Sequence, residues 1–377
     1  MHSLRPEPVP RIELVRAVMS VDRVEEGGSI LKGLVRVLVV DDSAYVRKTI
    51  KQILSRSPFI EVIGIAGDGE QALEMVKELH PDVVTLDLMM PGLDGLGFLT
   101  KQMASRPLPV IVVSTASDQN DLVLKALEAG AVDFVHKPSM SATEKIFEMS
   151  DELIEKVKKA ATIRLKRFEP ARLVKPFVVT SGPVRRTGSV DAVVIGISTG
   201  GPQGLKYLIP QLAENFPVPV AVVLHIPVGY TEMYAAKLDE LSRLKVMEAK
   251  EGDPLRAGVV LIAPAGRHLT FRRNGNNSVT AHLDARPFDM PHRPSVDVLF
   301  ESAAEIFRNR TLGVVMTGMG SDGRQGASCI KAQGGRIYTE AEETCVVYGM
   351  PAAVVEAGLS DRSIPLDRLA EAILEVV

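Results

Sequence analysis

Short apolar segments alternate with amphipathic ones from Val35 onward, and this alternation constrains the fold more than any other feature of the chain. Up to residue 161 it runs through five units in which a strand-like segment precedes a helical one, beginning with VRVLVV and YVRKTIKQILSR. Parallel strands need crossover connections, which helices usually supply. The pattern therefore predicts an α/β domain with an open, five-stranded parallel sheet and helices on both of its faces.

The alternation returns after residue 190 and predicts a second α/β domain. Strand-like segments there occupy residues 191–198, 218–226, 259–265, 311–318 and 336–341. Segments with helical spacing of apolar residues occupy residues 202–213, 231–241, 295–307 and 322–335. An NGNN sequence joins two alternating runs within residues 267–283, which favours a β-hairpin. We therefore expect a doubly wound, mostly parallel sheet with one antiparallel insertion.

The segment between these two patterns has the composition of a linker. It mixes basic residues with proline, serine and glycine and shows no sustained periodicity. The expected organisation is an N-terminal extension (1–33), a first domain (34–160), a linker (161–189) and a second domain (190–377). Two domains also suit a chain of 377 residues, of which 46% are hydrophobic.

Composition excludes several classes of protein. The formal net charge is −3 and charges of both signs are interleaved, so we expect no nucleic-acid partner. Cys329 and Cys345 are the only cysteines, which excludes a disulfide framework and agrees with a reducing compartment. No apolar run approaches the roughly 18 residues of a spanning helix, so we expect no membrane insertion. The sequence predicts a soluble, cytoplasmic protein.

Three aspartates follow predicted strands of the first domain. Asp41 and Asp42 come directly after VLVV, and Asp87 follows VVTL, at the edge where open parallel sheets bind ligands. Each aspartate alone is best explained as a cap of the following helix. Together they repel one another, by about 4 kcal/mol for a pair about 4 Å apart at an effective dielectric of about 20, so the cluster favours a bound cation. A purely oxygen ligand set favours Mg²⁺.

Lys137 and Ser114 follow two further strands, which brings an ammonium group and a hydroxyl to the same edge. These groups suit a phosphoryl oxygen, and the alternative for Lys137 is a solvated surface lysine. The segments VLVVDDSAYVRK, LDLMMPGLDGL, VVST and HKP occur in the order and at the intervals of a known family. Over residues 34–160 the chain resembles the receiver domain of two-component response regulators, a flavodoxin-like fold with a five-stranded parallel sheet.

The resemblance to receiver domains implies specific roles at this edge. Asp87 would be the phosphoacceptor, phosphorylated by a histidine kinase with Mg²⁺ as cofactor. The implied metal ligands are Asp42 directly, Asp41 through water, Asp87, and the main-chain carbonyl of Met89. Lys137 would pair with the phosphoryl group, and Ser114 with Phe134 would form the switch pair that moves on phosphorylation.

Ser198 lies in a G-x-S-x-G pattern formed with Gly196 and Gly200, between a predicted strand and a predicted helix. The pattern is typical of a nucleophile on a sharp turn, but chance matches are common. A phosphate-binding loop and plain turn chemistry are the alternatives. The phosphate-binding explanation is weaker, because GISTGGPQG has neither the Walker lysine nor the spacing of a dinucleotide-binding loop.

A nucleophilic serine needs a base and a carboxylate that orients the base. His225 ends a near-continuous apolar run and Asp322 follows another strand, so both are expected at the sheet edge that carries Ser198. The order Ser, His, Asp differs from the Ser, Asp, His order of α/β-hydrolases. The competing histidines are His268, His282 and His292.

The second domain resembles the catalytic domain of chemotaxis protein-glutamate methylesterases of the CheB type. The resemblance depends on GISTGGP, HIPVGYTE, IAPAGRHL, HRPSVDVLF, VVMTGMGSDG and TCVVYGMP. It implies Ser198 as nucleophile, His225 as base and Asp322 as its orienting carboxylate, with the Met319 amide and Thr199 serving the oxyanion hole. HRPSVDVLF and YGMP either shape the substrate cleft or begin helices. The departures from the family pattern are Ile197, Leu224, Val228 and Met89.

Together the two resemblances imply a phosphorylation-activated esterase that demethylates glutamyl methyl esters on the cytoplasmic helices of chemoreceptors, with possible deamidation of glutamines. The ester chemistry would need no cofactor. The alternative is a response regulator whose second domain is a binding or scaffold module without turnover.

Overall fold

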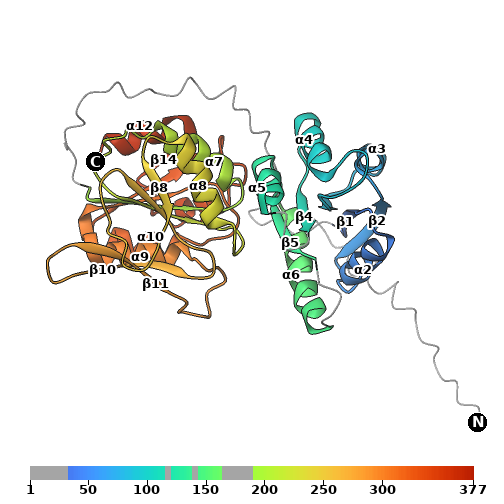
Figure 1. Ribbon diagram of the computed structural model, residues 1–377, viewed down its shortest axis with the longest axis horizontal. Coiled ribbons are helices and arrows are strands. Elements are labelled where there is room, and N and C mark those ends of the chain that lie inside the picture. Colours follow the sequence, from blue (N-terminus) through green and yellow to red (C-terminus); the bar gives the residue numbers. More distant parts are fainter. Residues whose placement is uncertain (1–32, 115–119, 138–142, 164–189) are drawn as a thin grey trace, which may run out of the picture. The chain divides into compact units, whose positions relative to one another are not determined.

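The computed structural model describes residues 33–114, 120–137, 143–163 and 190–377 (Figure 1). The expected linker from residue 164 onward and the N-terminal extension up to residue 32 lie outside the described residues. Within the described ranges no helix combines the length and the apolar character needed to cross a membrane.

The first sheet has five strands, all of them parallel. They are β1 (Val35–Val40), β2 (Ile60–Ala66), β3 (Val83–Leu86), β4 (Val110–Ser114) and β5 (Asp133–His136). Their spatial order, β2-β1-β3-β4-β5, is that of flavodoxin-like folds and confirms the predicted sheet. The helices that connect or follow these strands are α2 (Ala44–Leu54), α3 (Gly69–Leu79), α4 (Gly95–Ser105), α5 (Asn120–Glu128) and α6 (Thr143–Ala161).

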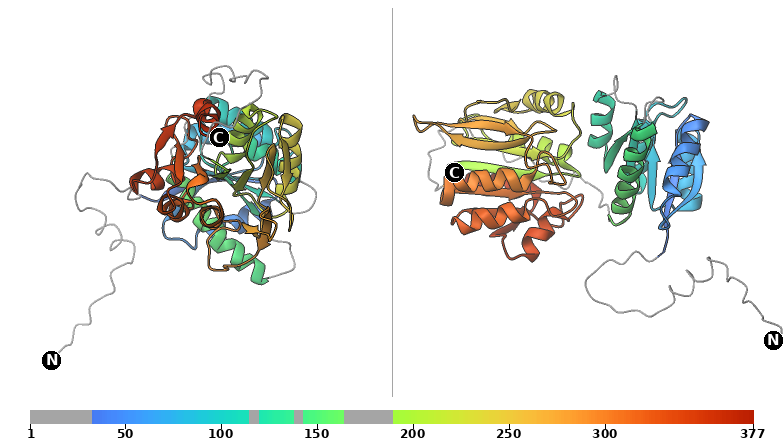
Figure 2. Two further views of the ribbon diagram at one scale, coloured as in Figure 1. Left: turned by 90° about the vertical axis from the view of Figure 1, so that its left-hand side faces the viewer. Right: turned by 90° about the horizontal axis from the view of Figure 1, so that it is seen from below.

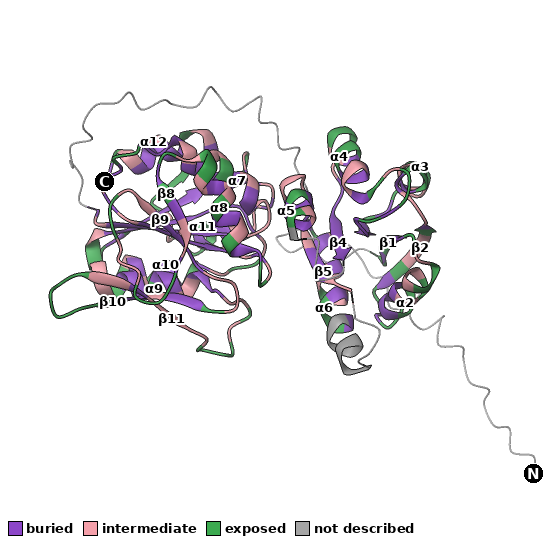
Figure 3. Cartoon of the chain, in the orientation of Figure 1, coloured by how far each residue is buried: buried purple, intermediate pink, exposed green. Residues whose placement is uncertain are grey.

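Side-chain alternation along β1 explains how the helices divide between the two faces. Val35, Val37 and Val39 pack in one cluster with residues of α2 and α6. Leu38 and Val40 point the other way and pack with residues of α3, α4 and α5. Strands buried on both faces appear in purple in Figure 3, for example β4. The loops at the carboxyl ends of the strands are therefore anchored on a sheet that is packed on both faces.

The second sheet has seven parallel strands in the order β14-β13-β12-β6-β7-β9-β8. These strands are β6 (Ala192–Ile197), β7 (Val220–Leu224), β8 (Lys245–Glu248), β9 (Val259–Ile262), β12 (Thr311–Val315), β13 (Arg336–Glu340) and β14 (Arg362–Ile364). The doubly wound, mostly parallel fold is confirmed. The sequence patterns predicted five of the strands and missed β8 and β14, because these edge strands are short (KVME and RSI) and carry exposed polar residues.

Helices cover both faces of the second sheet, as the two further views in Figure 2 show. They are α7 (Gly201–Leu208), α8 (Thr231–Leu241), α9 (Val296–Phe307), α10 (Arg324–Ala332), α11 (Met350–Glu356) and α12 (Leu366–Leu374), with two short 3₁₀ turns at Ile209–Gln211 and Arg308–Arg310. Ile195 and Val222 pack in one cluster with residues of α7, α8 and α12. Val194 and Val223 pack in another with residues of α9, α10 and α11.

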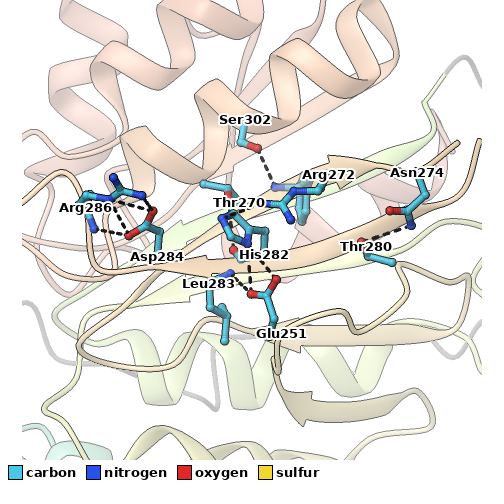
Figure 4. Close-up of polar contacts among 11 residues, drawn as sticks. Glu251, Thr270, Arg272, Asn274, Thr280, His282, Leu283, Asp284, Arg286 and Ser302 are labelled. Carbon is cyan, nitrogen blue, oxygen red and sulfur yellow. Dashed lines mark hydrogen bonds and ion pairs between the residues drawn. The ribbon is translucent and has the colours of Figure 1, made fainter.

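The expected hairpin consists of β10 (His268–Arg273) and β11 (Val279–Asp284), which pair antiparallel. Leu269 and Ala281 of this hairpin belong to the cluster that contains α9. Figure 4 shows a polar network on the hairpin, in which Glu251 accepts hydrogen bonds from His282 Nδ1 (2.9 Å) and the N–H of Leu283 (2.7 Å). The other ring nitrogen of His282 contacts Arg272 at 3.1 Å. His282 therefore fixes the hairpin and is not a base for Ser198.

Candidate functional site

Ser198 and His225 follow neighbouring strands of the second sheet. β6 and β7 pair so that Ile197 lies opposite Leu224, and the N–H of His225 donates to the carbonyl of Ile197 at 3.1 Å. Adjacent strands run about 4.8 Å apart, so the two residues leave the sheet from adjacent backbone positions. On the other side of β6, the N–H of Ser198 donates to the carbonyl of Thr317 at 3.0 Å. Three strand ends meet at Ser198, as predicted.

Two glycines permit the sharp turn at Ser198. Gly200 has φ of +79°, a left-handed conformation that side chains other than hydrogen disfavour. At Gly318, a Cβ atom would lie 2.8 Å from the Cβ of Ser198 and 2.4 Å from the sulfur of Met350. Both positions therefore require glycine, for conformation in the first case and for space in the second.

The imidazole of His225 reaches Asp322 across the sheet edge. Its Nε2 lies 2.9 Å from Oδ2 of Asp322, and both side chains are largely buried. An ionised carboxylate only accepts hydrogen bonds, so Nε2 carries the proton and Nδ1 is left as the acceptor nitrogen. Nδ1 is buried and has no hydrogen-bond partner within the described part of the chain. Because Nε2 binds Asp322, Nδ1 is the ring nitrogen left to act as a base, the reverse of the ring orientation in chymotrypsin-type triads.

The hydroxyl of Ser198 and Nδ1 of His225 do not hydrogen-bond in the described part of the chain. Such contacts between nucleophile and base are often long before substrate binds. The structure thus places Ser198, His225 and Asp322 at one sheet edge, and of these three residues His225 and Asp322 are hydrogen-bonded to each other.

Three groups at the start of α9 also bind Asp322. Ser295 Oγ and the N–H of Asp297 each donate to Oδ1 at 2.9 Å, and the N–H of Val296 donates to Oδ2 at 2.8 Å. Burial alone would raise the pKa of Asp322, but the hydrogen bonds from His225 and from the α9 amides outweigh burial and lower it. Asp322 is therefore held as an anion, which is the state that orients the imidazole.

These α9 groups were not predicted as parts of the site. The only sequence signal was HRPSVDVLF, for which cleft shaping and helix initiation were equal alternatives. Ser295 is in fact the N-cap of α9, and its hydroxyl also donates to Asp322. HRPSVDVLF thus begins α9, and its residue Ser295 also anchors the carboxylate of Asp322.

The remaining histidine candidates have other contacts. His268 is fully buried, with Nδ1 accepting from the N–H of Ser295 (3.2 Å) and Nε2 lying 3.1 Å from the carbonyl of Pro287. His292 stacks on His225, with ring centroids 4.2 Å apart and planes inclined by 18°. Burial and the neighbouring His225 lower the pKa of His292 to about 4. A neutral ring thus covers one face of His225.

Loops carrying Thr199 and Met319 flank Ser198. The hydroxyl of Thr317 donates to the carbonyl of Thr199 at 3.0 Å. The carbonyl of Gly318, the residue before Met319, accepts two N–H groups from the start of α11 at 2.8 and 3.0 Å. Both loops are therefore fixed by hydrogen bonds, while the oxyanion-hole role of Thr199 and Met319 stays a prediction.

A carboxyl group that the sequence patterns did not single out lies beneath these loops. Glu340 ends β13 and is completely buried. It accepts hydrogen bonds from the N–H of Thr317 (2.9 Å) and from the hydroxyl of Thr344 (3.1 Å). Burial raises its pKa to about 7, although these two hydrogen bonds oppose the rise. An acidic residue at the end of an apolar strand was the only available signal.

We expect Glu340 to make the protein less stable as pH rises. The native state keeps a proton on Glu340 between the ordinary pKa of 4.5 and the raised value of about 7, whereas the unfolded chain loses it. The free energy of unfolding should therefore fall by about 3 kcal/mol across this range, at about 1.36 kcal/mol per pH unit. Glu340→Gln, which keeps an acceptor for Thr317, should abolish this dependence in denaturant titrations between pH 5 and 8.5.

Glu356→Gln is the matched control for that measurement, because Glu356 lies exposed at the end of α11. This variant should follow the wild-type dependence on pH. If Glu340→Gln and wild type show the same change in unfolding free energy, Glu340 does not titrate in this range.

The predicted acidic cluster is present at the first sheet. One carboxylate oxygen from each of Asp41, Asp42 and Asp87 lies within 4.8 Å of the others. Lys137 Nζ is 2.7 Å from an oxygen of Asp41 and 2.7 Å from one of Asp87, so it is not a solvated surface lysine. Burial raises the pKa of Asp87 more than the hydrogen bond and charge of Lys137 lower it. Three converging oxygen ligands with two buried members fit a small hard cation such as Mg²⁺.

The expected switch residues lie on the adjacent strands β4 and β5, and Lys137 directly follows β5. Ser114 ends β4 and pairs in register with His136, and Phe134 of β5 pairs with Val112. The ring of Phe134 makes an edge contact with His136 at 4.4 Å between centroids. The switch role of Ser114 and Phe134 stays a prediction.

Comparison with known proteins divides the chain in the same way. Residues 37–149 match the response regulator receiver domain model, and residues 193–373 match the CheB methylesterase model. Receiver domains as a class bind Mg²⁺ for phosphorylation. The fold and its two clusters thus define a response regulator whose output domain is a hydrolase.

Full-length relatives narrow the class. A protein-glutamate methylesterase/protein-glutamine glutaminase of Myxococcus xanthus is 50% identical over 334 residues, covering 88% of this chain and 95% of that protein. Relatives with the same name from Symbiobacterium thermophilum and Methanosarcina acetivorans are 44% and 41% identical, and each covers 91% of this chain and at least 97% of its own length. The chain belongs to the CheB family of protein-glutamate methylesterases.

Proposed function

We propose that this chain hydrolyses glutamyl methyl esters on the cytoplasmic helices of chemoreceptors and releases methanol. The observation that carries the proposal is the hydrogen bond between His225 and Asp322 at the strand end next to Ser198. The names of the relatives support the same reaction, and they extend it to deamidation of glutamine side chains. In both reactions the nucleophile attacks the carbonyl carbon of a side chain, which belongs to an ester in one case and to an amide in the other.

The proposed mechanism uses the protein groups alone. Ser198 Oγ attacks the ester carbonyl while Nδ1 of His225 takes the hydroxyl proton. Asp322 stabilises the resulting imidazolium through Nε2, and the Met319 amide and Thr199 stabilise the oxyanion. Collapse breaks the bond to methoxide, which leaves as methanol with the proton from His225. Water, deprotonated by His225, then cleaves the acyl-serine and regenerates the hydroxyl.

We infer that the receiver regulates this activity through Asp87. The carboxylates of Asp41, Asp42 and Asp87 with the carbonyl of Met89 would hold Mg²⁺, which supplies charge neutralisation during phosphoryl transfer. Lys137 would pair with the phosphoryl group, and Ser114 and Phe134 would respond to it. A histidine kinase is the proposed phosphodonor, and the unphosphorylated receiver restrains the esterase domain.

The domain limits belong to the same proposal: a receiver over 34–160, a linker over 161–189 and an esterase domain over 190–377. The end of α6 at Ala161 and the start of β6 at Ala192 support these limits to within two residues. A cytoplasmic location follows from the proposed substrate, because the methylated receptor helices lie in the cytoplasm.

The proposal is tested by methanol release from membranes that contain methylated chemoreceptors. Purified full-length protein with Mg²⁺ and a small phosphodonor should release methanol in proportion to the receptor methyl groups present. Membranes with unmethylated receptors are the control for other methanol sources. Binding to receptors without methanol release would instead assign the second domain to a scaffold role.

Asp87→Asn should abolish activation by the phosphodonor while the basal rate of methanol release persists. The amide cannot form the acyl phosphate, so phosphoryl incorporation into the protein should also be absent. Asp82→Asn is the matched control, because Asp82 lies at the opposite end of β3 and accepts from the N–H of Arg36. Normal activation of the Asp87 variant would exclude Asp87 as the phosphoacceptor.

A further inference from the structure

α9 and α10 cap one another through two aspartates. Asp322, two residues before α10, accepts the N–H groups of Val296 and Asp297 at the start of α9. In return, Oδ1 of Asp297 accepts the N–H groups of Gly323 (2.9 Å) and Gly326 (2.7 Å) at the start of α10. Each carboxylate thus satisfies main-chain donors that its partner helix leaves unpaired.

α10 depends on this arrangement for its N-terminal cap. Its N-cap residue is Gly323, which has no side chain that could accept a hydrogen bond. The two helices also approach closely, since a Cβ atom on Gly326 would lie 2.8 Å from the carbonyl oxygen of Asp297 and 2.5 Å from the Cβ of Phe300. The carboxyl group of Asp297 is therefore the cap of α10, supplied from the neighbouring helix.

The same contacts hold the Asp322 side chain and the backbone directly after it. Asp297 binds the N–H of Gly323, the residue directly after Asp322. Its own N–H binds Oδ1 of Asp322, while Oδ2 faces His225. A shift of α10 away from α9 would move Oδ2 out of line with Nε2 of His225.

We propose that Asp297 is a positioning residue of the active site, which holds Asp322 against His225 by capping α10 from the first turn of α9. This inference rests on the proposed function. Within the described ranges Asp297 makes no hydrogen bond to His225, and it acts through the hydrogen bonds to Gly323 and Gly326. Burial and the neighbouring Asp322 raise the pKa of Asp297, as expected for two carboxyl groups in one cluster.

The test compares Asp297→Ala with Asp297→Asn in the full chain. Alanine removes the acceptor for both α10 amides, whereas the asparagine carbonyl keeps it. Alanine should lower kcat for methyl-ester hydrolysis about 10- to 100-fold with KM little changed, because misplacement of about 1 Å costs rate and not binding. Asparagine should restore most of the rate. Asp239→Ala is the matched control, because Asp239 accepts the N–H of Val246 from another element, at 2.7 Å, and lies outside the triad.

A second measurement separates this inference from the proposed function. The proton on Nε2 of His225, held by Asp322, should give a far-downfield imidazole resonance in proton NMR that needs no substrate. The resonance should vanish in Asp297→Ala, persist in Asp297→Asn and vanish in Asp322→Ala, which assigns it. If wild type shows the resonance but releases no methanol, the proposed function fails and the NMR comparison still decides the role of Asp297.

Two outcomes would overturn the proposal. One is an alanine variant with wild-type kcat and an intact resonance, which would make Asp297 a helix cap of purely structural importance. The other is an equal loss of kcat in the alanine and asparagine variants, which would exclude the hydrogen-bond acceptor as the cause. If the alanine variant does not fold, Asp297→Ser replaces it, since the shorter hydroxyl cannot reach both amides.

Discussion

Ser198→Ala is expected to abolish ester hydrolysis, with kcat falling on the order of 10⁶-fold as in other serine hydrolases that lose the nucleophile. Without Oγ no acyl-enzyme can form, and Nδ1 of His225 has no proton to accept. The residual rate would come from the oxyanion site and substrate binding alone. Methanol release from methylated receptor membranes measures the loss, and a serine-reactive phosphonate should label wild type but not the variant.

Ser242→Ala is the control for this substitution. Ser242 ends α8, where its hydroxyl donates to the carbonyl of Leu238, and it lies outside the triad. Its variant should keep both turnover and phosphonate labelling. Retained hydrolysis in Ser198→Ala, or phosphonate labelling of the variant at another residue, would remove Ser198 from the nucleophile role.

The position of Ser198 was predictable because strand ends of a parallel sheet meet at one edge. An apolar strand, a glycine-flanked serine and a helix follow one another directly in the sequence, so local patterns locate the turn. The same logic located Asp41 and Asp87 at the first sheet. The edge strand β8 was not predicted in this way, because an edge strand needs no continuous apolar run.

The anchoring of Asp322 was not predictable in the same way. Ser295 and Asp297 contact it across a separation of more than 20 residues, and the contact depends on how α9 packs against α10. The orientation of the His225 ring is also a tertiary result, since either nitrogen could have faced the carboxylate. Glu340 was not predicted because burial of a single carboxyl group under a loop leaves no periodic signal in the sequence.

The orientation of the His225 ring gives the second large expected effect, for Asp322→Asn. The asparagine amide can donate a hydrogen bond to Nε2 of His225, which an aspartate cannot do. Nε2 would then be the acceptor and the ring proton would move to Nδ1, the nitrogen that must take the proton from Ser198. The expected loss in kcat is about 10⁴-fold, the effect of the wrong tautomer in a triad.

The measurement is kcat for methanol release with Asp361→Asn as the matched control. Asp361 also accepts a main-chain N–H, that of Ile337 at 2.7 Å, but it lies before β14 and outside the triad. The asparagine oxygen at the Oδ1 position still accepts from Ser295 and Asp297, and only the N–H of Val296 loses its acceptor. Thermal unfolding should therefore change less than the rate. If the variant loses stability together with rate, the contact between α9 and α10 has collapsed. If its rate stays within a few-fold of wild type, Asp322 does not set the tautomer of His225.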